Sequence, residues 1–223
     1  MTQRHWQASY GSIPKEINPD AYRSVVDLME QAMKRFADKP AMRCAGQTLT
    51  YAQLDSLSRD FAAYLQCRLG VKKGDRIAVM APNLLAFPIA FLGIIRAGAV
   101  QVNVNPLYTP RELEHQLADA GAETIIVYSG VSATVAEVMA KTRLKTVITV
   151  GVGDGSGVAL PSPPVDGRLS GAIAFTGALA EGEFSRGFTA RGKPGPATRG
   201  NARHGINDYT NWFGILCFRH VCV

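Results

Sequence analysis

The sequence predicts an α/β fold in which helices flank a parallel sheet, followed by a disordered C-terminal tail. Two observations predict the sheet. Between Arg76 and Val150, strand-like apolar runs alternate with segments of helical periodicity. The strand-like runs are apolar on both faces, which is typical of parallel strands covered by helices on each side.

The first elements precede this alternation. Apolar residues recur every three or four positions from Ser24 to Phe36, which predicts an amphipathic helix that Pro40 ends. Residues 41–44 and 47–50 flank the turn pair Ala45-Gly46, so we expect a short hairpin there. Thr50 and Gln53 form a capping box, which predicts a helix that begins after Thr50 and runs to Gly70.

The alternating region then gives the remaining elements in order. Capping residues predict helices that begin at Asn83 and at Thr109-Pro110-Arg111-Glu112. The first of these runs through Ile95 and should be kinked or delayed by Pro88, and the second ends at Gly121. Strands are predicted at 76–80, 99–104, 124–128 and 145–150. A further helix is predicted at 132–141, between the last two strands.

Composition excludes several classes of protein. Apolar residues make up 47% and charged residues 19% of the 223 residues, as in ordinary globular proteins rather than disordered ones. The sequence has no run of about 20 apolar residues, which is the length that a membrane-spanning helix needs. The first residues lack the apolar core of a secretory signal. Four cysteines are too few for a disulfide scaffold and are compatible with a reducing cytoplasm.

The net charge of +6 is concentrated at one end. Residues 184–223 hold six basic side chains against Asp208 alone, whereas the preceding part is nearly neutral. This tail is rich in Arg, Gly and Pro and has neither helical nor strand periodicity, so we predict that it is disordered. Translation of GC-rich DNA in a wrong reading frame produces such a change, and a genuine basic extension is the alternative.

Four groups of residues are candidates for a site, and each has a simpler interpretation. Gly151 to Gly157 follows a strand like a dinucleotide fingerprint, but prolines replace the helix that should come next, so we expect a flexible surface loop. His115 is expected to face solvent. The other candidates lie in the tail. Zinc binding by Cys217, His220 and Cys222 lacks a fourth ligand, and nucleic-acid binding by tail arginines with Trp212 and Phe213 lacks an ordered scaffold.

The body of the chain resembles the N-terminal part of adenylate-forming (AMP-binding) enzymes, most of all bacterial long-chain fatty acid–CoA ligases. The resemblance covers about Tyr22 to Val150. Its most specific part is NPLYT at 105–109 followed by RELEHQL at 111–117. Gly74-Asp75-Arg76 and Arg96-Ala97-Gly98 are shared more widely in the superfamily and discriminate less.

The resemblance implies ATP-dependent activation of a fatty acid to an acyl-adenylate, which CoA converts to the thioester, in a cytoplasmic enzyme with peripheral association at the inner membrane. ATP, Mg²⁺ and CoA would serve the complete enzyme. The family's Thr/Ser/Gly-rich phosphate loop ending in Lys-Gly is expected soon after Phe175 and is missing there. We therefore assign no catalytic, cofactor-binding or metal residue, and we expect an inactive N-terminal fragment.

This interpretation divides the chain into an N-terminal extension (1–21), a partial AMP-binding domain (22–183) and the basic tail (184–223). Two other hypotheses stay open. A non-enzymatic α/β module could bind acidic partners through its basic tail, with an affinity that falls steeply as salt rises. An aggregation-prone truncated product would have no function and would expose apolar sheet edges. No specific nucleic-acid binding is expected.

Overall fold

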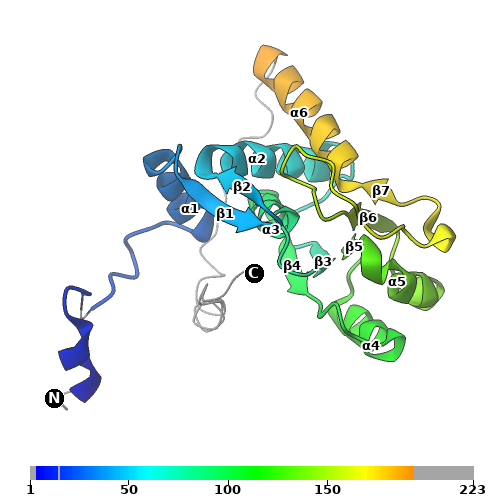
Figure 1. Ribbon diagram of the computed structural model, residues 1–223, viewed down its shortest axis with the longest axis horizontal. Coiled ribbons are helices and arrows are strands. Elements are labelled where there is room, and N and C mark those ends of the chain that lie inside the picture. Colours follow the sequence, from blue (N-terminus) through cyan, green and yellow to red (C-terminus); the bar gives the residue numbers. More distant parts are fainter. Residues whose placement is uncertain (1–3, 15, 193–223) are drawn as a thin grey trace.

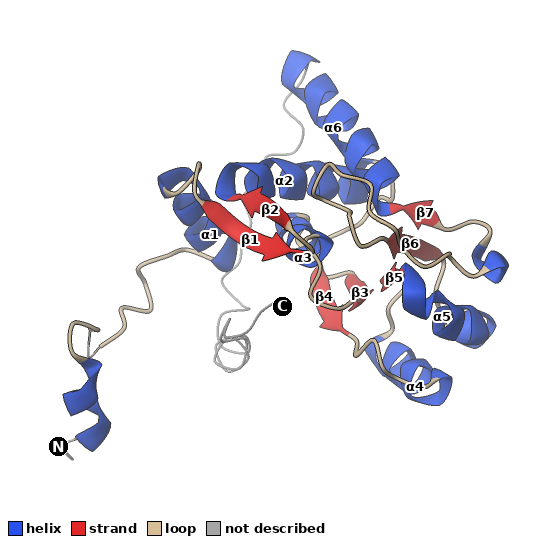
Figure 2. Ribbon diagram, viewed as in Figure 1, coloured by secondary structure: helices blue, strands red, loops and turns tan. Residues whose placement is uncertain are grey.

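The computed structural model describes residues 4–14 and 16–192, with side chains described up to residue 186. Its centre is a five-stranded sheet in the order β4-β3-β5-β6-β7, in which every neighbouring pair is parallel (Figures 1 and 2). The predicted fold class is therefore confirmed for these residues. The strands are β3 (Arg76–Met80), β4 (Val100–Asn103), β5 (Thr124–Tyr128), β6 (Thr146–Val150) and β7 (Ile173–Ala174).

Helices cover both faces of the sheet, and alternate strand residues point to each of them. Ile77, Val79 and Ile126 pack toward α2 (Tyr51–Cys67), α3 (Ala86–Arg96) and α6 (Phe175–Gly192). Ala78 and Val127 pack toward α4 (Pro110–Ala120) and α5 (Ser132–Val138). Burial on both faces explains why the central strands consist almost entirely of apolar residues.

The elements before the sheet follow the sequence closely. Helix α1 (Val25–Arg35) begins where the Ser24 hydroxyl accepts from the Asp27 N–H at 3.1 Å. Strands β1 (Pro40–Cys44) and β2 (Gln47–Thr50) form the predicted antiparallel hairpin. Its turn has φ values of 48° at Ala45 and 72° at Gly46, so both turn residues adopt the left-handed conformation of a tight hairpin.

Both predicted capping boxes are present. The Thr50 hydroxyl and the Gln53 side chain satisfy each other's backbone N–H groups at the start of α2. At the start of α4, the Glu112 carboxylate accepts from the Thr109 N–H at 2.8 Å and from its hydroxyl at 2.7 Å. Helix α4 ends at Gly121, which has φ 63° and closes the helix in the left-handed conformation that glycine favours.

Helix α3 begins later than the cap at Asn83 alone predicts, as expected from Pro88. The helix begins at Ala86 rather than after Asn83, and it has no side-chain cap. The reason is Pro88, which has no N–H to donate to the carbonyl four residues earlier. A helix that began at Asn83 would need that hydrogen bond, whereas a start at Ala86 places Pro88 in the first turn, where no intrahelical partner is required.

Helix α6 extends past the predicted boundary of the tail. It runs from Phe175 to Gly192 and packs against α2, with the Phe175 and Phe61 ring centroids 4.8 Å apart. Figure 1 shows it rising at an angle from the end of α2. Residues 184–192 are therefore helical, not disordered as we expected. The rest of the predicted tail, 193–223, lies outside the described residues.

The N-terminal residues lead away from the sheet and its helices (Figure 1). They include a short 3-10 helix, η1 (His5–Tyr10), of which no residue is buried. Among the residues that the structure describes, no helix is long and apolar enough to cross a membrane.

Candidate functional site

The topology of the sheet indicates where a ligand would bind. The chain passes from β3 to β4 on one side and then returns to β5 on the other side of β3. Helix α3 and helices α4 and α5 consequently lie on opposite faces. In open parallel sheets, ligands bind at such a switch point, outside the carboxyl ends of the strands. The loops after β3 (81–85) and after β5, where the chain forms the short 3-10 helix η2 (Ser129–Val131), frame this candidate site.

The loop after β6 packs against the start of α3, beside this switch point. Gly155 has φ 88°, and a Cβ there would collide with Ile89 Cδ1 and lie 3.7 Å from the Ala86 nitrogen. Gly153 is buried, and a Cβ on it would collide with the Val158 carbonyl. The glycine-rich run is thus a loop, as predicted, but it is packed against the fold and does not form a flexible surface loop.

Side chains of the same loop use its backbone donors. The Gly151 N–H donates to Asp154 Oδ2 at 2.9 Å, and the Val152 N–H donates to Ser162 Oγ at 2.8 Å. Burial raises the pKa of Asp154, although the Gly151 hydrogen bond opposes that shift. A phosphate cradle needs several N–H groups that converge at the start of a helix, and no helix follows this run directly. The run is therefore not a dinucleotide site.

The opposite edge of the sheet has a cavity of about 330 Å³ beside the amino ends of β3, β5 and β6. Three of the charged side chains that line it have partners within the fold. Lys145 Nζ lies 2.7 Å from Glu123 Oε2, and Asp75 Oδ2 accepts from the Lys72 N–H at 2.8 Å. This cavity lies away from the switch point, so the carboxyl edge remains the candidate site.

The other sequence candidates do not converge on that edge. His115 is exposed on α4, as predicted. Cys217, His220, Cys222, Trp212 and Phe213 lie outside the described residues, as does most of the basic tail. Within the described part of the chain, no three His, Cys, Asp or Glu side chains are grouped to hold a metal ion.

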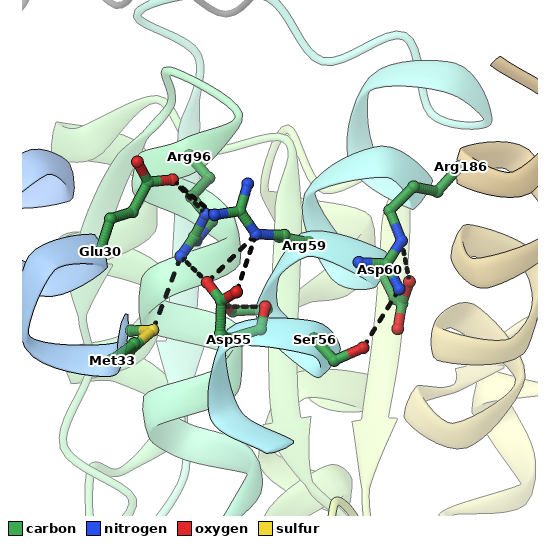
Figure 3. A network of polar contacts seen from close by, with 9 residues as sticks. Glu30, Met33, Asp55, Ser56, Arg59, Asp60, Arg96 and Arg186 are labelled. Carbon is green, nitrogen blue, oxygen red and sulfur yellow. Dashed lines mark hydrogen bonds and ion pairs between the residues drawn. The ribbon is translucent and has the colours of Figure 1, made fainter. Parts of the chain in front are cut away.

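Sequence reasoning missed the main polar network of the fold, which joins α1, α2 and α3 (Figure 3). Arg96 Nη1 lies 2.7 Å from Glu30 Oε1, and its Nη2 lies 2.6 Å from Asp55 Oδ1. Arg59 contacts the same two carboxylates at 3.0 and 3.1 Å. Only the Asp55–Arg59 pair has a recognisable helical spacing in the sequence. The network binds three helices together and is structural.

The two arginines of this network differ in their electrostatics. Burial lowers the pKa of Arg96, and the neighbouring Arg59 charge lowers it further. Burial also opposes the charged form of Arg59, but the hydrogen bond and charge of Asp55, with Glu30, outweigh it and raise the pKa of Arg59. Both guanidiniums remain cationic at neutral pH because an arginine pKa lies far above it.

A second contact attaches α6 to α2 (Figure 3). Arg186 Nε lies 2.9 Å from the buried Asp60 Oδ1, and Arg186 Nη2 donates to Ser56 Oγ at 3.1 Å. Burial raises the pKa of Asp60, Arg186 opposes this shift, and Glu183 adds to it. The helices approach each other closely at Gly182, where a Cβ would collide with the Asp60 carbonyl oxygen. Sequence reasoning assigned Arg186 to the tail, yet it packs here.

Residues 29–167, from within α1 to the loop after β6, match the family model described as AMP-binding enzyme. This segment holds four of the five sheet strands and both framing loops of the switch point. The chain belongs to the AMP-binding enzyme family.

Several relatives of high identity are long-chain-fatty-acid–CoA ligases. The chain is 53% identical over 150 residues to the long-chain-fatty-acid–CoA ligase of Escherichia coli O157:H7, which covers 67% of this chain and 27% of that protein. The corresponding Yersinia pestis ligase is 49% identical over 153 residues, with 68% and 27% covered. The predicted resemblance is confirmed, and the chain spans about a quarter of the length of these relatives.

Solved structures show the same fold. An anthranilate CoA ligase in complex with anthranoyl-AMP superposes with a TM-score of 0.61 at 22% identity, over 72% of this chain and 28% of that one. A long-chain-fatty-acid–CoA ligase from Archaeoglobus fulgidus gives a TM-score of 0.56 at 24% identity, over 72% and 35%. At these identities the likeness establishes the architecture alone.

Proposed function

We propose that this chain is part of an ATP-dependent long-chain-fatty-acid–CoA ligase. The observation that carries the proposal is its 53% identity to the E. coli ligase over 150 residues. In such an enzyme, the fatty acid carboxylate attacks the α-phosphate of ATP and releases pyrophosphate. The thiol of CoA then attacks the acyl-adenylate, displaces AMP and forms the thioester.

The described residues do not fit a Mg²⁺–ATP site. In the glycine-rich loop, the N–H groups of residues 151 and 152 already donate to the side chains of Asp154 and Ser162. The described part of the chain also has no group of three His, Cys, Asp or Glu side chains that could hold the metal. We therefore place no chemical step on these residues. Their proposed role is a scaffold that holds the loops at the carboxyl edge of the sheet.

ATP and CoA are cytoplasmic metabolites, whereas a long-chain fatty acid partitions into lipid. We infer a cytoplasmic location with peripheral association at the inner membrane, because the enzyme would meet both kinds of substrate there. We further infer that the isolated chain is inactive, since the residues that would hold the nucleotide are not among those described.

A chimeric enzyme tests the proposal. Residues 29–167 replace the matching segment of the E. coli ligase, and palmitoyl-CoA formation is measured beside thermal unfolding. We expect turnover within about tenfold of the parent, a loss of under about 1.4 kcal/mol in transition-state stabilisation. A chimera that unfolds at the parent temperature but forms no thioester would contradict the proposal.

Two controls complete this test. The same chimera with Arg96→Ala should lose both stability and activity. It therefore shows how much activity is lost when the fold is destabilised. The isolated 223-residue chain should catalyse no pyrophosphate exchange with ATP and palmitate. Exchange that depends on ATP would contradict the inferred inactivity and would place the nucleotide site within this chain.

A further inference from the structure

The N-terminal segment, defined here as residues 4–14 and 16–24, exposes large apolar side chains. Trp6, Ile13 and Ile17 are 59%, 63% and 90% exposed, and Tyr22 is also exposed. Figure 1 shows the segment leading away from the helices and the sheet. Isolated exposed apolar residues are common on protein surfaces, but four large ones within 17 positions indicate a surface for interaction.

The backbone of this segment limits what the partner can be. Pro14 directly follows Ile13, and Pro19 lies two residues after Ile17. A continuous amphipathic helix cannot cross these prolines, so the segment is unsuited to an apolar groove that accepts a helix. Proline also lacks the N–H that pairing with a sheet edge requires. The interface of a lipid bilayer imposes neither requirement, because backbone groups at that depth remain hydrated.

The side-chain chemistry also fits a bilayer interface. Tryptophan and tyrosine concentrate at the boundary between lipid headgroups and hydrocarbon, where one part of the ring is wet and the rest is apolar. In the sequence, positions 4–24 hold Arg4, Lys15 and Arg23 against Glu16 and Asp20, a net charge of +1. The segment is thus close to neutral, unlike the strongly basic residues 184–223, so its attraction to lipid would depend on apolar contact rather than on charge.

We propose that the N-terminal segment inserts Trp6, Ile13 and Ile17 into the interface of a lipid bilayer. This inference rests on the proposed function, because docking at a bilayer would bring a ligase to the surface into which its fatty acid substrate partitions. The binding is driven by burial of apolar surface and therefore depends only weakly on salt.

The two tryptophans of the chain allow the segment and the tail to be observed separately. Trp212→Phe leaves Trp6 as the reporter, and Trp6→Phe leaves Trp212. Each full-length variant is titrated with phosphatidylcholine vesicles, and with vesicles that also contain phosphatidylglycerol, in 0.1 and 0.5 M NaCl. We expect Trp6 emission to shift to shorter wavelength with both kinds of vesicle at both salt concentrations.

Paired substitutions locate the contact. In the Trp212→Phe background, Ile13→Ser together with Ile17→Ser should weaken vesicle partitioning by at least tenfold, since burying one isoleucine is worth about a tenfold change or more. Val158→Ser, at another exposed apolar residue, is the matched control and should leave partitioning unchanged. The temperature of thermal unfolding should be the same for the parent, the double isoleucine variant and the Val158→Ser variant, because none of the substituted side chains is buried.

Three results would overturn the proposal. The first is Trp6 emission that does not change with either vesicle. The second is a response confined to Trp212 and to anionic vesicles that disappears in 0.5 M NaCl, which would assign lipid binding to the basic tail. The third is concentration-dependent association in the absence of lipid that the isoleucine substitutions abolish, which would make a second copy of the chain the partner. These three results do not depend on the turnover of the chimera. If either the lipid-binding proposal or the proposed function fails its test, the other can still be judged.

Discussion

Replacing Arg96 should destabilise the fold far more than replacing Arg59, although both arginines contact the same two carboxylates. The side chain of Arg96 is 7% exposed, and that of Arg59 is 41% exposed. The comparison therefore varies burial while the partners, Glu30 and Asp55, stay fixed. We expect the two losses of stability to differ because water can solvate the carboxylates that remain beside an exposed site better than those beside a buried one.

The magnitude can be worked from the geometry. Removing one partner of a buried ion pair typically costs about 3–5 kcal/mol, because the other charge is left without compensation. Here the carboxylates of Glu30 and Asp55 are 39% and 32% exposed and keep Arg59, so solvent recovers part of that cost. We expect Arg96→Ala to cost about 2–4 kcal/mol, against about 0.2–1 kcal/mol for the exposed pairs that Arg59→Ala removes.

Urea unfolding of both variants in 0.05 and 0.5 M NaCl is the assay. Salt screens exposed charges much more than buried ones, so the cost of Arg59→Ala should largely vanish in high salt while that of Arg96→Ala persists. Arg96→Lys should rescue little, because one ammonium cannot reproduce a planar fork that contacts Glu30 and Asp55 through separate nitrogens. Equal costs for the two alanine variants, or equal sensitivity to salt, would refute the argument from burial.

Three further predictions concern the helices. Gly182→Ala should cost about 1–3 kcal/mol, because its Cβ meets the Asp60 carbonyl, whereas Gly177→Ala on the same helix has open space and should be neutral or stabilising. Thr109→Ala should cost about 0.5–2 kcal/mol through loss of the cap, while His115→Ala on the same exposed helix stays within about 0.5 kcal/mol. Asp60→Asn should unfold at the same or higher urea concentration than the unaltered chain at pH 7, since burial raises the pKa of Asp60 and disfavours its ionised form.

The pH dependence of the last variant has a definite sign. A carboxyl whose pKa is higher in the folded state stabilises the fold fully below its unfolded value, near 3.8, and loses that contribution as pH rises through the folded value. The stability of the unaltered chain relative to Asp60→Asn should therefore increase as the pH falls. A relative decrease would show that pairing with Arg186 outweighs burial.

Each helix prediction has its own contrary result, also measured by urea unfolding. A neutral Gly182→Ala would mean that α6 is free to move away from α2. A costless Thr109→Ala would mean that solvent satisfies the first turn of α4 as well as the hydroxyl does. A large loss of stability for His115→Ala would mean that its ring packs within the fold.

The sequence predicted what local chemistry decides. Strands β3 and β5 have the predicted bounds because turn residues set off short apolar runs, and α4 begins and ends where Thr109 and Gly121 predict. The delayed start of α3 could also be predicted, because a proline at 88 disfavours a helix that begins at Asn83. Helix α6 could not, since it lacks a clear amphipathic period and contains glycines at 177 and 182 that local propensity disfavours.

The polar networks were not predictable for a different reason. Glu30, Asp55 and Arg96 come from three helices, and no local pattern pairs them. Gly182 shows the same limit, because its role depends on the backbone of α2 more than 100 positions earlier. The carboxyl-edge site became visible only once the order of the strands was known, since a switch point is a property of the whole sheet.

The order of the strands has a consequence for how the protein is made. After β3 and β4 have paired, β5 joins the free side of β3, β6 joins β5, and β7 joins β6. No strand has to be inserted between two that are already hydrogen-bonded. The sheet can therefore grow at a single edge in the order in which the ribosome delivers its strands. Each new strand can therefore pair with a strand that the ribosome has already delivered.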